Sequence, residues 1–549
     1  MTVRSARIAS FDWARFAAVG RNIGRKPAFG WACLCLVLVT TSLLVLLGSV
    51  PGSPIVGHVP RGAPPPSMLT HAARSLGLEK LNASQSPVLA YILITGACVG
   101  FLGTLLAVRE RGIPTWAVIG SSIVAIAFAT LGPPLFSHDV YSYALYGRMW
   151  VLQHVNPYIQ SPSVAVHDPF LPVASNGLRS VYGPLFTLIS GVLVWVFRSP
   201  AATVAAFKFL SGAAWIGVVV LAYRLGRRRG MMQASFAAAV VGLNPVITLR
   251  LIAGGHNDAL VSLAIMAAIA AWYDGHRLLV TFFLTLGMLV KIVAVIPLVI
   301  FLWEMIRSES TFRGRLVTLG KHLAVVVALT ALAVIPFGAP LRVLSAFSKV
   351  ASLSNGSPRP PELVLSSASA SALRSLRLPQ LVTLSNDVLQ IAFLGLAALT
   401  LLVLLRRRDR PIVEVILLSL LIFMLCSRYL QPWYLAWVVP LACFATRRRV
   451  LGIVLAMSLI AAETAPAKSE GQLLTWLARF SYDIYPALAL VFIAILVVEV
   501  VRRPGVEVQT TQIDTGGHDI ARGSDTGKRE SNDTELGHSS TVLRSDSQS

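Results

Sequence analysis

The stretch WACLCLVLVTTSLLVLLGSV, residues 31–50, decides the class of fold. It carries no charged side chain and has the length, about 20 residues, that an α-helix needs to cross a bilayer. It is too long for the apolar core of a signal peptide, and no convincing cleavage site follows it. We therefore expect a retained transmembrane helix behind a basic N-terminus that ends in Arg25 and Lys26.

Apolar blocks of this kind recur along the chain, in which hydrophobic residues make up 55% of 549 and charged residues 13%. Blocks, rather than a helical or alternating pattern, are typical of a polytopic membrane protein. The pattern predicts an all-α polytopic integral membrane protein with about 14 transmembrane helices, the shorter of which can be broken or re-entrant. The expected spans lie near residues 31–50, 87–108, 115–135, 201–225, 231–252, 259–273, 278–291, 292–306, 321–337, 388–405, 411–426, 433–446, 450–462 and 485–501.

The formal net charge of +22 could suggest a nucleic-acid partner, but the basic residues stand in short clusters between the apolar blocks. Such clusters orient helices and form no binding groove, so we expect no nucleic acid. All five cysteines fall inside apolar blocks, without the spacing of a disulfide framework or of a metal site.

The segment 184–197 decides the orientation, because it is apolar but short. If it lies along the membrane interface, every strong basic cluster falls on one side, which the positive-inside rule makes cytoplasmic. These clusters lie at residues 109–111, 227–229, 276–277, 307–321, 406–410, 447–449 and 502–503. The four segments that carry polar motifs then share the external face: 137–158, 254–258, 338–387 and 427–434.

These assignments predict the organisation of the chain. We expect a basic cytoplasmic N-terminus over 1–30, N-terminal transmembrane helices over 31–135, and an external catalytic loop with a juxtamembrane helix over 136–200. A transmembrane core over 201–501, with an external loop at 338–387, precedes a tail over 502–549 whose polar composition predicts disorder in the cytoplasm.

Asp139 is the strongest candidate for chemistry. It is the only carboxylate within residues 111–167 and lies in SHDVYSYALYGR, residues 137–148, directly after an apolar span. Ionisable residues at such a place are functional candidates by default, and a carboxylate at a partly desolvated membrane mouth suits a general base. The alternative is a helix cap, in which Ser137 or Asp139 satisfies the free N–H groups of a helix that begins at Val140.

Other residues of this loop are candidate substrate contacts. Arg148 would place a cation beside the acid, where it could neutralise a phosphate. The prolines of HVNPYIQ (154–160) and VYGPLF (181–186) also stop helices, and tyrosines at this depth also anchor the interface. The candidates are His138, Tyr141, Tyr143, Arg148, Asn156, Tyr158 and Tyr182.

Further candidates lie in the later motif segments. GGHND (254–258) offers a hydrogen-bonding shelf for a sugar, or a second acid that orients an acceptor, but also suits a plain loop cap. Lys291 would suit a lipid phosphate, or could snorkel to the interface. SRYLQPWY (427–434) combines a cation with aromatic rings, as an aromatic belt also does. The candidates are His256, Asn257, Asp258, Lys291, Arg428, Gln431 and Trp433.

A divalent metal is possible, since His138, Asp139, His256 and Asp258 carry suitable ligand atoms. No HExxH, CxxC or clustered-acid spacing supports it, so metal dependence stays open. No nucleotide-binding glycine loop is present in the sequence, and no other cofactor is expected.

The order of these motifs resembles the GT-C membrane glycosyltransferases that use polyprenyl-phosphate sugars. Acid-x-Tyr after a membrane helix, then Asn-Pro-Tyr and Tyr-x-Pro-Leu, are similar to their first external loop. The segments 138–148, 243–260 and 427–437 look most similar to the polyprenol-phosphomannose-dependent α-1,6-mannosyltransferases of actinobacterial lipoglycan synthesis, the MptA and MptB type. The chain departs from many GT-C enzymes in placing this loop after the third span and in reading YGP where relatives have YPP.

The resemblance implies a GT-C-like bundle in a bacterial cytoplasmic membrane, with Asp139 as the base on an acceptor hydroxyl. It implies the donor polyprenyl-phosphate-mannose, which enters from the membrane lipid, and an α-1,6-mannan or lipomannan-type glycan or glycolipid acceptor on the external face. Inversion at the anomeric carbon needs one base, and cations suffice to stabilise the leaving phosphate. The alternatives are transfer of another polyprenyl-linked sugar, such as arabinose or another hexose, and a lipid-sugar flippase or transporter.

Overall fold

The computed structural model of the chain describes residues 20–502, apart from 57–58, 61, 83, 175–177, 344, 346–354, 357–359 and 465–484. The expected tail, from residue 503 onward, and most of the expected N-terminal region lie outside the described residues.

Every expected span is helical. The helices that correspond to the spans are α2 (Pro27–Gly48), α4 (Gln85–Arg109), α5 (Thr115–Leu131), α8 (Pro200–Arg227), α9 (Met231–Gly242) with η3 (Val246–Ile252), α10 (Asp258–Tyr273), α11 (Arg277–Val290), α12 (Val295–Arg307), α13 (Phe312–Val334), α16 (Val382–Arg406), α17 (Ile412–Cys426), η7 (Pro432–Trp437) with α18 (Val439–Ala442), α19 (Arg448–Ala462) and α21 (Tyr485–Val501). Shorter elements connect them: α3 (Ser67–Ser75), η1 (Leu78–Lys80), α6 (Asp139–Val151), η2 (Pro162–Val164), α7 (Pro184–Val196), η4 (Ile292–Ala294), η5 (Ile335–Phe337), α15 (Pro361–Ser375) and η6 (Pro379–Leu381).

Only some of these helices are long enough to cross a membrane. Among the described residues, five helices are long and apolar enough to cross a bilayer, and α9 with η3 forms a sixth candidate bent by 44°. Several of the others are shorter apolar helices. The helical membrane-type fold is therefore confirmed, while the predicted number of spans stays a prediction.

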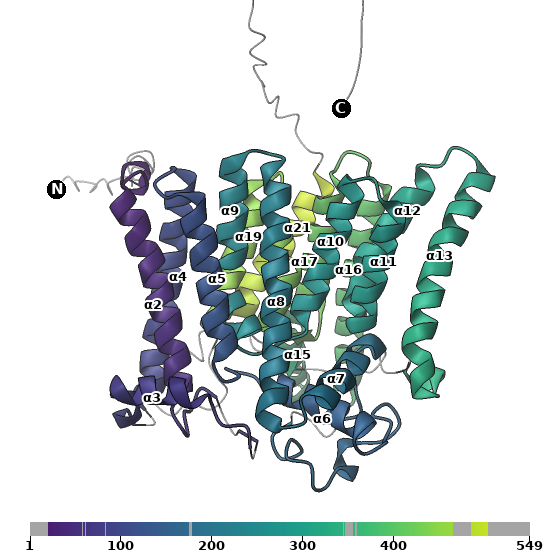
Figure 1. Cartoon of the computed structure of the whole chain (residues 1–549). Helices are drawn as coiled ribbons and strands as arrows, with labels where there is room; N and C mark the ends of the chain where they lie inside the picture. The colour runs from purple at the N-terminus through teal and green to yellow at the C-terminus, as the bar shows by residue number, and fades with distance from the viewer. Residues whose placement is uncertain are drawn as a thin grey trace, which may run out of the picture. The chain divides into compact units, whose positions relative to one another are not determined.

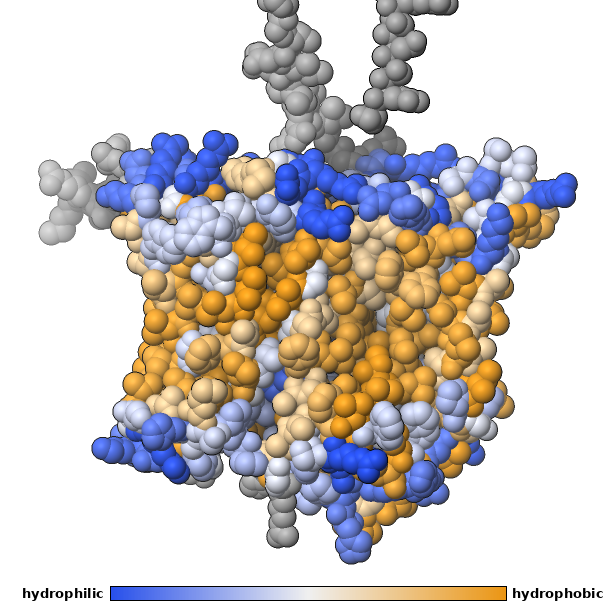
Figure 2. Space-filling view, viewed as in Figure 1, coloured by the Kyte–Doolittle hydropathy of each residue, from blue (hydrophilic) through white to orange (hydrophobic). Residues whose placement is uncertain are grey.

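The long helices stand side by side, and their two ends differ in character (Figure 1). The loops that join α4 to α5, α8 to α9, α10 to α11 and α12 to α13 lie at one end, and α3, α6 and α7 lie at the other. Figure 2 shows a broad hydrophobic band between two hydrophilic rims. We call the end with the arginine-bearing loops the basic end and the end with α6 and α7 the site end.

The segment that decided the orientation forms α7, which lies beside α6 at the site end, as expected of a juxtamembrane helix (Figure 1). Two glycines allow the close approach. A Cβ on Gly147 would lie 2.6 Å from the Ser190 carbonyl oxygen, and one on Gly191 would lie 2.5 Å from the Trp150 ring. The basic clusters and the motif segments thus fall at opposite ends, while the side of the membrane that each end faces stays a prediction.

Two expected spans are interrupted: 231–252, which has full crossing length, and the shorter 433–446. Pro245 separates α9 from η3, and the Asn244 Oδ1 atom accepts a hydrogen bond from the Val246 N–H at 3.1 Å. The expected span 433–446 consists of the tight turn η7 followed by the short α18. All residues of η3 and η7 are buried, which is where irregular backbone is tolerated at membrane depth.

The expected loop 338–387 is shorter than predicted and partly helical. It contains α15, and α16 already begins at Val382. Residues 382–387 contain neither proline nor glycine, so the helix can extend toward the site end although most of them are polar. A two-residue parallel pairing of β1 (Asn355–Gly356) with β2 (Tyr429–Leu430) connects the loop to the last motif segment, a small departure from a purely helical fold.

Candidate active site

Asp139 opens α6, so that its carboxylate lies at the mouth of the bundle. The Ser137 hydroxyl accepts a hydrogen bond from the Asp139 N–H at 3.2 Å. The chain just before it is tied down by a hydrogen bond from the Leu135 N–H to the Ala253 carbonyl at 3.1 Å, which joins it to the segment that follows η3. The Asp139 side chain is 19% exposed, so it is sheltered but still reachable.

His256 pairs with Asp139. Its Nδ1 atom lies 3.4 Å from the Asp139 Oδ2 atom, and its ring stacks on Trp433 with centroids 3.7 Å apart and planes 16° apart. The imidazole is fully buried, and among the described residues neither ring nitrogen makes a hydrogen bond of normal geometry. Its nitrogens therefore keep capacity for the carboxylate or for a substrate hydroxyl.

A glycine makes this arrangement possible. Gly255 has φ of +72°, a left-handed conformation that glycine adopts without steric cost. A Cβ on it would lie 3.2 Å from the Lys208 Cγ atom and 3.4 Å from the Val140 Cγ2 atom. The turn thereby brings His256 against the start of α6, and the Ser211 hydroxyl donates to the His256 carbonyl at 3.1 Å.

Asp258 and Lys291 form a buried ion pair beside this centre. The Lys291 ammonium donates to the two oxygens of the Asp258 carboxylate at 2.8 and 3.0 Å, and the Trp437 indole N–H donates to Asp258 at 2.8 Å. The ammonium also lies 4.3 Å from the centre of the Tyr434 ring. Asp258 is fully buried, so its charge needs this compensation, and it is less available to act as a second acid.

Aromatic side chains line the α6 side of the site. Tyr143 is buried with its ring edge-on to Tyr182 and Phe186, at centroid distances of 4.8 Å each. Its hydroxyl lies 3.4 Å from the Asn257 Oδ1 atom, to which it donates. Burial, followed by the negative charges of Asp139 and Asp258, raises the pKa of Tyr143 far above its usual value, so it acts as a hydrogen-bond donor.

Tyr141 and His138 flank Asp139. The Tyr141 hydroxyl is buried and has no hydrogen-bond partner among the described residues, and burial raises its pKa. The His138 ring lies 5.8 Å from the Tyr141 ring. The Asn257 amide nitrogen is likewise buried without a partner in the described structure. These unsatisfied groups are the type that a hydroxyl-rich substrate could engage.

Three candidates of the α6 loop make structural contacts. The Arg148 Nε atom donates to Asp168 at 2.7 Å, so the cation is already compensated. The Asn156 side chain donates to the Phe337 carbonyl at 2.6 Å. The Tyr158 hydroxyl donates to the Tyr182 carbonyl at 2.9 Å. These contacts support the scaffold interpretation of the prolines and tyrosines, and nothing among them points to a substrate.

In the last motif segment, 427–434, two candidates likewise make structural contacts and one lies at His256. The Arg428 Nε atom lies 2.9 Å from the buried Glu362 carboxylate of α15, and its Nη1 atom donates to Gln390 of α16 at 2.8 Å. Gln431 precedes η7 and hydrogen-bonds the Tyr429 side chain. Trp433 alone of this segment's candidates contacts His256 in the described structure.

Sequence reasoning missed Lys208 of α8. It is 1% exposed, and its ammonium donates to the Pro133 and Ala253 carbonyls at 2.9 Å each. It thus connects the chain before α6 to the chain before His256. The signal was present, because a lysine in the middle of the apolar span 201–225 is unusual and its neighbours give no other reason for it.

Metal ligands are sparse. Over the described ranges, no group of three or more His, Cys, Asp and Glu side chains could hold a metal ion. Asp139 and His256 lie together, whereas Asp258 is held by Lys291.

Comparisons with known proteins agree on one family. Residues 39–307 match the family model described as alpha-(1->6)-mannopyranosyltransferase, N-terminal domain, and residues 369–499 match the MptB C-terminal domain model. The chain is 24% identical over 405 residues to alpha-(1->6)-mannopyranosyltransferase A of Mycobacterium tuberculosis, covering 70% of this chain and 77% of that protein. It is 30% identical over 138 residues to a probable alpha-(1->6)-mannopyranosyltransferase of Mycolicibacterium smegmatis, 24% of each chain.

Proposed function

The chain belongs to the alpha-(1->6)-mannopyranosyltransferase family and is a mannosyltransferase, and from this premise we propose its donor, acceptor and mechanism. The donor is polyprenyl-phosphate-mannose. The acceptor is the 6-hydroxyl of an α-1,6-mannan or lipomannan-type chain, and transfer takes place at the site end on the external face of the cytoplasmic membrane.

The observation that carries the proposal is the pairing of Asp139 with His256. A partly exposed carboxylate, 3.4 Å from a buried imidazole and at the end of the bundle, has the access and shelter that a general base needs. The acceptor oxygen attacks the anomeric carbon of mannose while its proton passes to the Asp139 carboxylate. The bond from that carbon to the phosphate oxygen breaks, and polyprenyl phosphate leaves with the electron pair. The configuration inverts, so no protein nucleophile is required.

Neighbouring groups have supporting roles in this proposal. The unsatisfied polar atoms of Tyr141 and Asn257 are suited to bind sugar hydroxyls. Lys291, whose side chain is 16% exposed and whose partner Asp258 follows His256 by two residues, is the cation that we assign to the leaving phosphate. Arg148 and Arg428 are each paired with a carboxylate and contribute less to this proposal.

The test is direct transfer by detergent-solubilised protein from labelled polyprenyl-phosphate-mannose to an α-mannoside acceptor. Asp139→Asn keeps the shape of the side chain but removes its basicity, so we expect the rate to fall by at least about 100-fold. Protein level and membrane insertion should persist. Asp274→Asn is the matched control, since this carboxylate is 41% exposed at the basic end and should leave the rate unchanged.

Near-normal transfer by Asp139→Asn would exclude Asp139 as the base. Transfer from GDP-mannose alone would exclude the lipid donor and the external site. Membranes supplied with polyprenyl-phosphate arabinose or another hexose test the choice of sugar. Product formation in leaky membranes, where no gradient exists, separates an enzyme from a flippase or transporter.

A further inference from the structure

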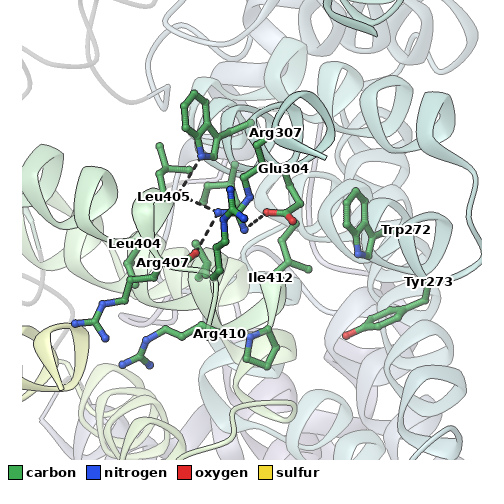
Figure 3. A pocket seen from close by; sticks show the side chains of 14 residues that line it. Trp272, Tyr273, Glu304, Arg307, Leu404, Leu405, Arg407, Arg410 and Ile412 are labelled. Atoms are coloured by element: carbon green, nitrogen blue, oxygen red, sulfur yellow. Dashed lines mark hydrogen bonds and ion pairs between the residues drawn. The ribbon is translucent and has the colours of Figure 1, made fainter. Parts of the chain in front are cut away.

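A second polar site lies at the basic end, far along the bundle from Asp139. A pocket of about 330 Å³ opens where α10 and α12 end, α16 ends and α17 begins (Figure 3). Four arginines and one glutamate are among its lining residues. The proposed transferase chemistry uses none of them.

The frame of this pocket is fixed by contacts between helices. The Trp303 indole N–H donates to the Leu405 carbonyl at 2.9 Å, and the Arg307 Nη1 atom donates to the same carbonyl at 3.2 Å. Glu304, the acid of the lining, pairs with Arg307 (Figure 3). The acid is therefore already compensated. Arg407 and Arg410 are likewise paired, with Asp409 and Glu414, so in the described structure Arg408 is the lining arginine without a carboxylate partner.

Arg410 has a buried donor that lacks an acceptor. Its side chain is 1% exposed, and its two terminal nitrogens bind Glu414 and the carbonyls of Glu499 and Arg502. Its Nε atom is buried with no hydrogen-bond partner among the described residues. An unmet buried N–H of a charged group is costly, which favours an anionic acceptor at this point of the pocket wall.

Arg408 offers the accessible charge. It is exposed, it lines the pocket, and within the described part of the chain it makes no hydrogen bond or ion pair. Arg406 lies two positions earlier, is also exposed, and does not line the pocket. Arg406 ends α16 and Arg408 lies in the loop that follows, so the two arginines are close in sequence and equal in charge but differ in their relation to the pocket.

The other side of the pocket is aromatic and apolar. Tyr273 and Trp303 line it and are 45% and 46% exposed, as expected of rings at headgroup depth. Val299 of α12 and Leu402 of α16 are apolar side chains exposed on the same helices, at 41% and 54%. A cationic pocket between helices, bordered by apolar surface, matches an anionic head with attached acyl chains better than it matches a soluble anion.

We propose that this pocket binds the phosphodiester headgroup of an anionic glycerophospholipid from the leaflet at the basic end. Arg408 contacts the phosphate, Arg410 lies buried in the pocket wall beside it, and the acyl chains lie along the exposed faces of α12 and α16. The binding is a property of the basic end and does not depend on the transfer reaction proposed for the site end.

The experiment is native mass spectrometry of the full chain in detergent, titrated with phosphatidylglycerol. Diacylglycerol with the same acyl chains, inorganic phosphate and polyprenyl phosphate are the comparison ligands. We expect one phosphatidylglycerol to be retained in preference to the other three. Arg408→Gln should weaken it about fivefold, the effect of one basic side chain near a lipid surface. Arg406→Gln should leave the affinity unchanged.

Equal affinity for diacylglycerol, or equal weakening by the Arg406 and Arg408 variants, would overturn the proposal. Displacement of phosphatidylglycerol by inorganic phosphate would show that the pocket binds a soluble anion. Tighter binding of polyprenyl phosphate would show that it binds a donor-type lipid. Both would also overturn it. The Arg408→Lys variant keeps the charge, so it should bind phosphatidylglycerol more tightly than Arg408→Gln does. This comparison distinguishes the loss of charge from a folding defect in the glutamine variant.

Discussion

At the scale of single residues, the site separates into groups that are satisfied and groups that are not. The candidate cations Arg148, Lys291 and Arg428 each have a carboxylate partner. The ring nitrogens of His256 and the hydroxyl of Tyr141 have no hydrogen-bond partner among the described residues. Evolution rarely leaves such atoms buried without a role, so the second group is where a substrate is expected.

His256→Gln tests whether the imidazole positions Asp139. The substitution removes the ring 3.4 Å from the carboxylate and its stacking on Trp433. We expect kcat for mannose transfer to fall about 10-fold or more, with KM changed little, because orientation of the base acts in the transition state. Steady-state kinetics with varied acceptor checks this. A rise in KM at constant kcat would instead make His256 a plain binding residue.

Lys291→Met tests the buried ion pair. It leaves the fully buried carboxylate of Asp258 without its cation, so we expect the free energy of unfolding to fall by about 3 kcal/mol. Adding Asp258→Asn should restore part of that loss, since the uncompensated charge is then gone. Thermal unfolding of the two single variants and the double variant in one detergent measures the coupling. Additive losses would show that the two groups do not interact.

At the scale of elements, glycine contacts hold the juxtamembrane helices against the core. A Cβ on Gly183 would lie 2.0 Å from the Leu289 carbonyl oxygen, and the Gly183 N–H donates to the Val290 carbonyl at 3.1 Å. The start of α7 is therefore packed backbone to backbone against the end of α11. The position of the site end relative to the membrane core depends on this contact.

Gly183→Ala should displace α7 from α11. We expect a loss of about 1–3 kcal/mol in unfolding free energy, since backbone cannot give way as a flexible side chain can. Gly120→Ala in α5 is the matched control, because nothing lies within 4 Å of the added methyl group and alanine favours helix. Thermal unfolding of both variants, with transfer rates, checks this. Equal stability of the two would mean that the close approach is not needed.

The sequence predicts elements better than contacts. Apolar length is a local property, so the span near 201–225 was found and corresponds to α8. The start of α16 was misplaced, because the polar residues Ser385, Asn386 and Asp387 suggested a loop although the helix runs through them from Val382. The partner of Arg428 is Glu362, on a different helix, and the sequence gives no sign of that pairing. Lys208 was overlooked although a lone charge in an apolar span is unusual, and the sequence does not show the two carbonyls that it bridges.

At the scale of the whole molecule, charges separate the two ends of the bundle. A separate network ties the helices together at the basic end: Arg410 pairs with Glu414 of α17 and donates to the Glu499 carbonyl of α21, and Arg447, before α19, pairs with the Glu499 carboxylate. With basic loops concentrated there, the positive-inside rule predicts that this end is cytoplasmic.

Cysteine labelling tests that orientation. We expect Val166→Cys, at a site-end position that is 69% exposed, to react with a membrane-impermeant maleimide in intact cells. Met231→Cys, 52% exposed at the start of α9 on the basic end, should react only after permeabilisation. The native cysteines are buried except Cys35, so the unmodified chain gives the background. The reverse labelling pattern would show that the basic end faces outward and the site end faces the cytoplasm.

Few residues of α13 and α16 are buried in the described structure, about 17% and 11% of the most apolar stretch of each. A surface that faces lipid tails must be apolar but needs no particular shape, so one aliphatic residue can replace another there. Mutation can therefore accumulate on these two helices at little cost to the fold. In a lineage of such enzymes these two helices should diverge faster than the buried α17.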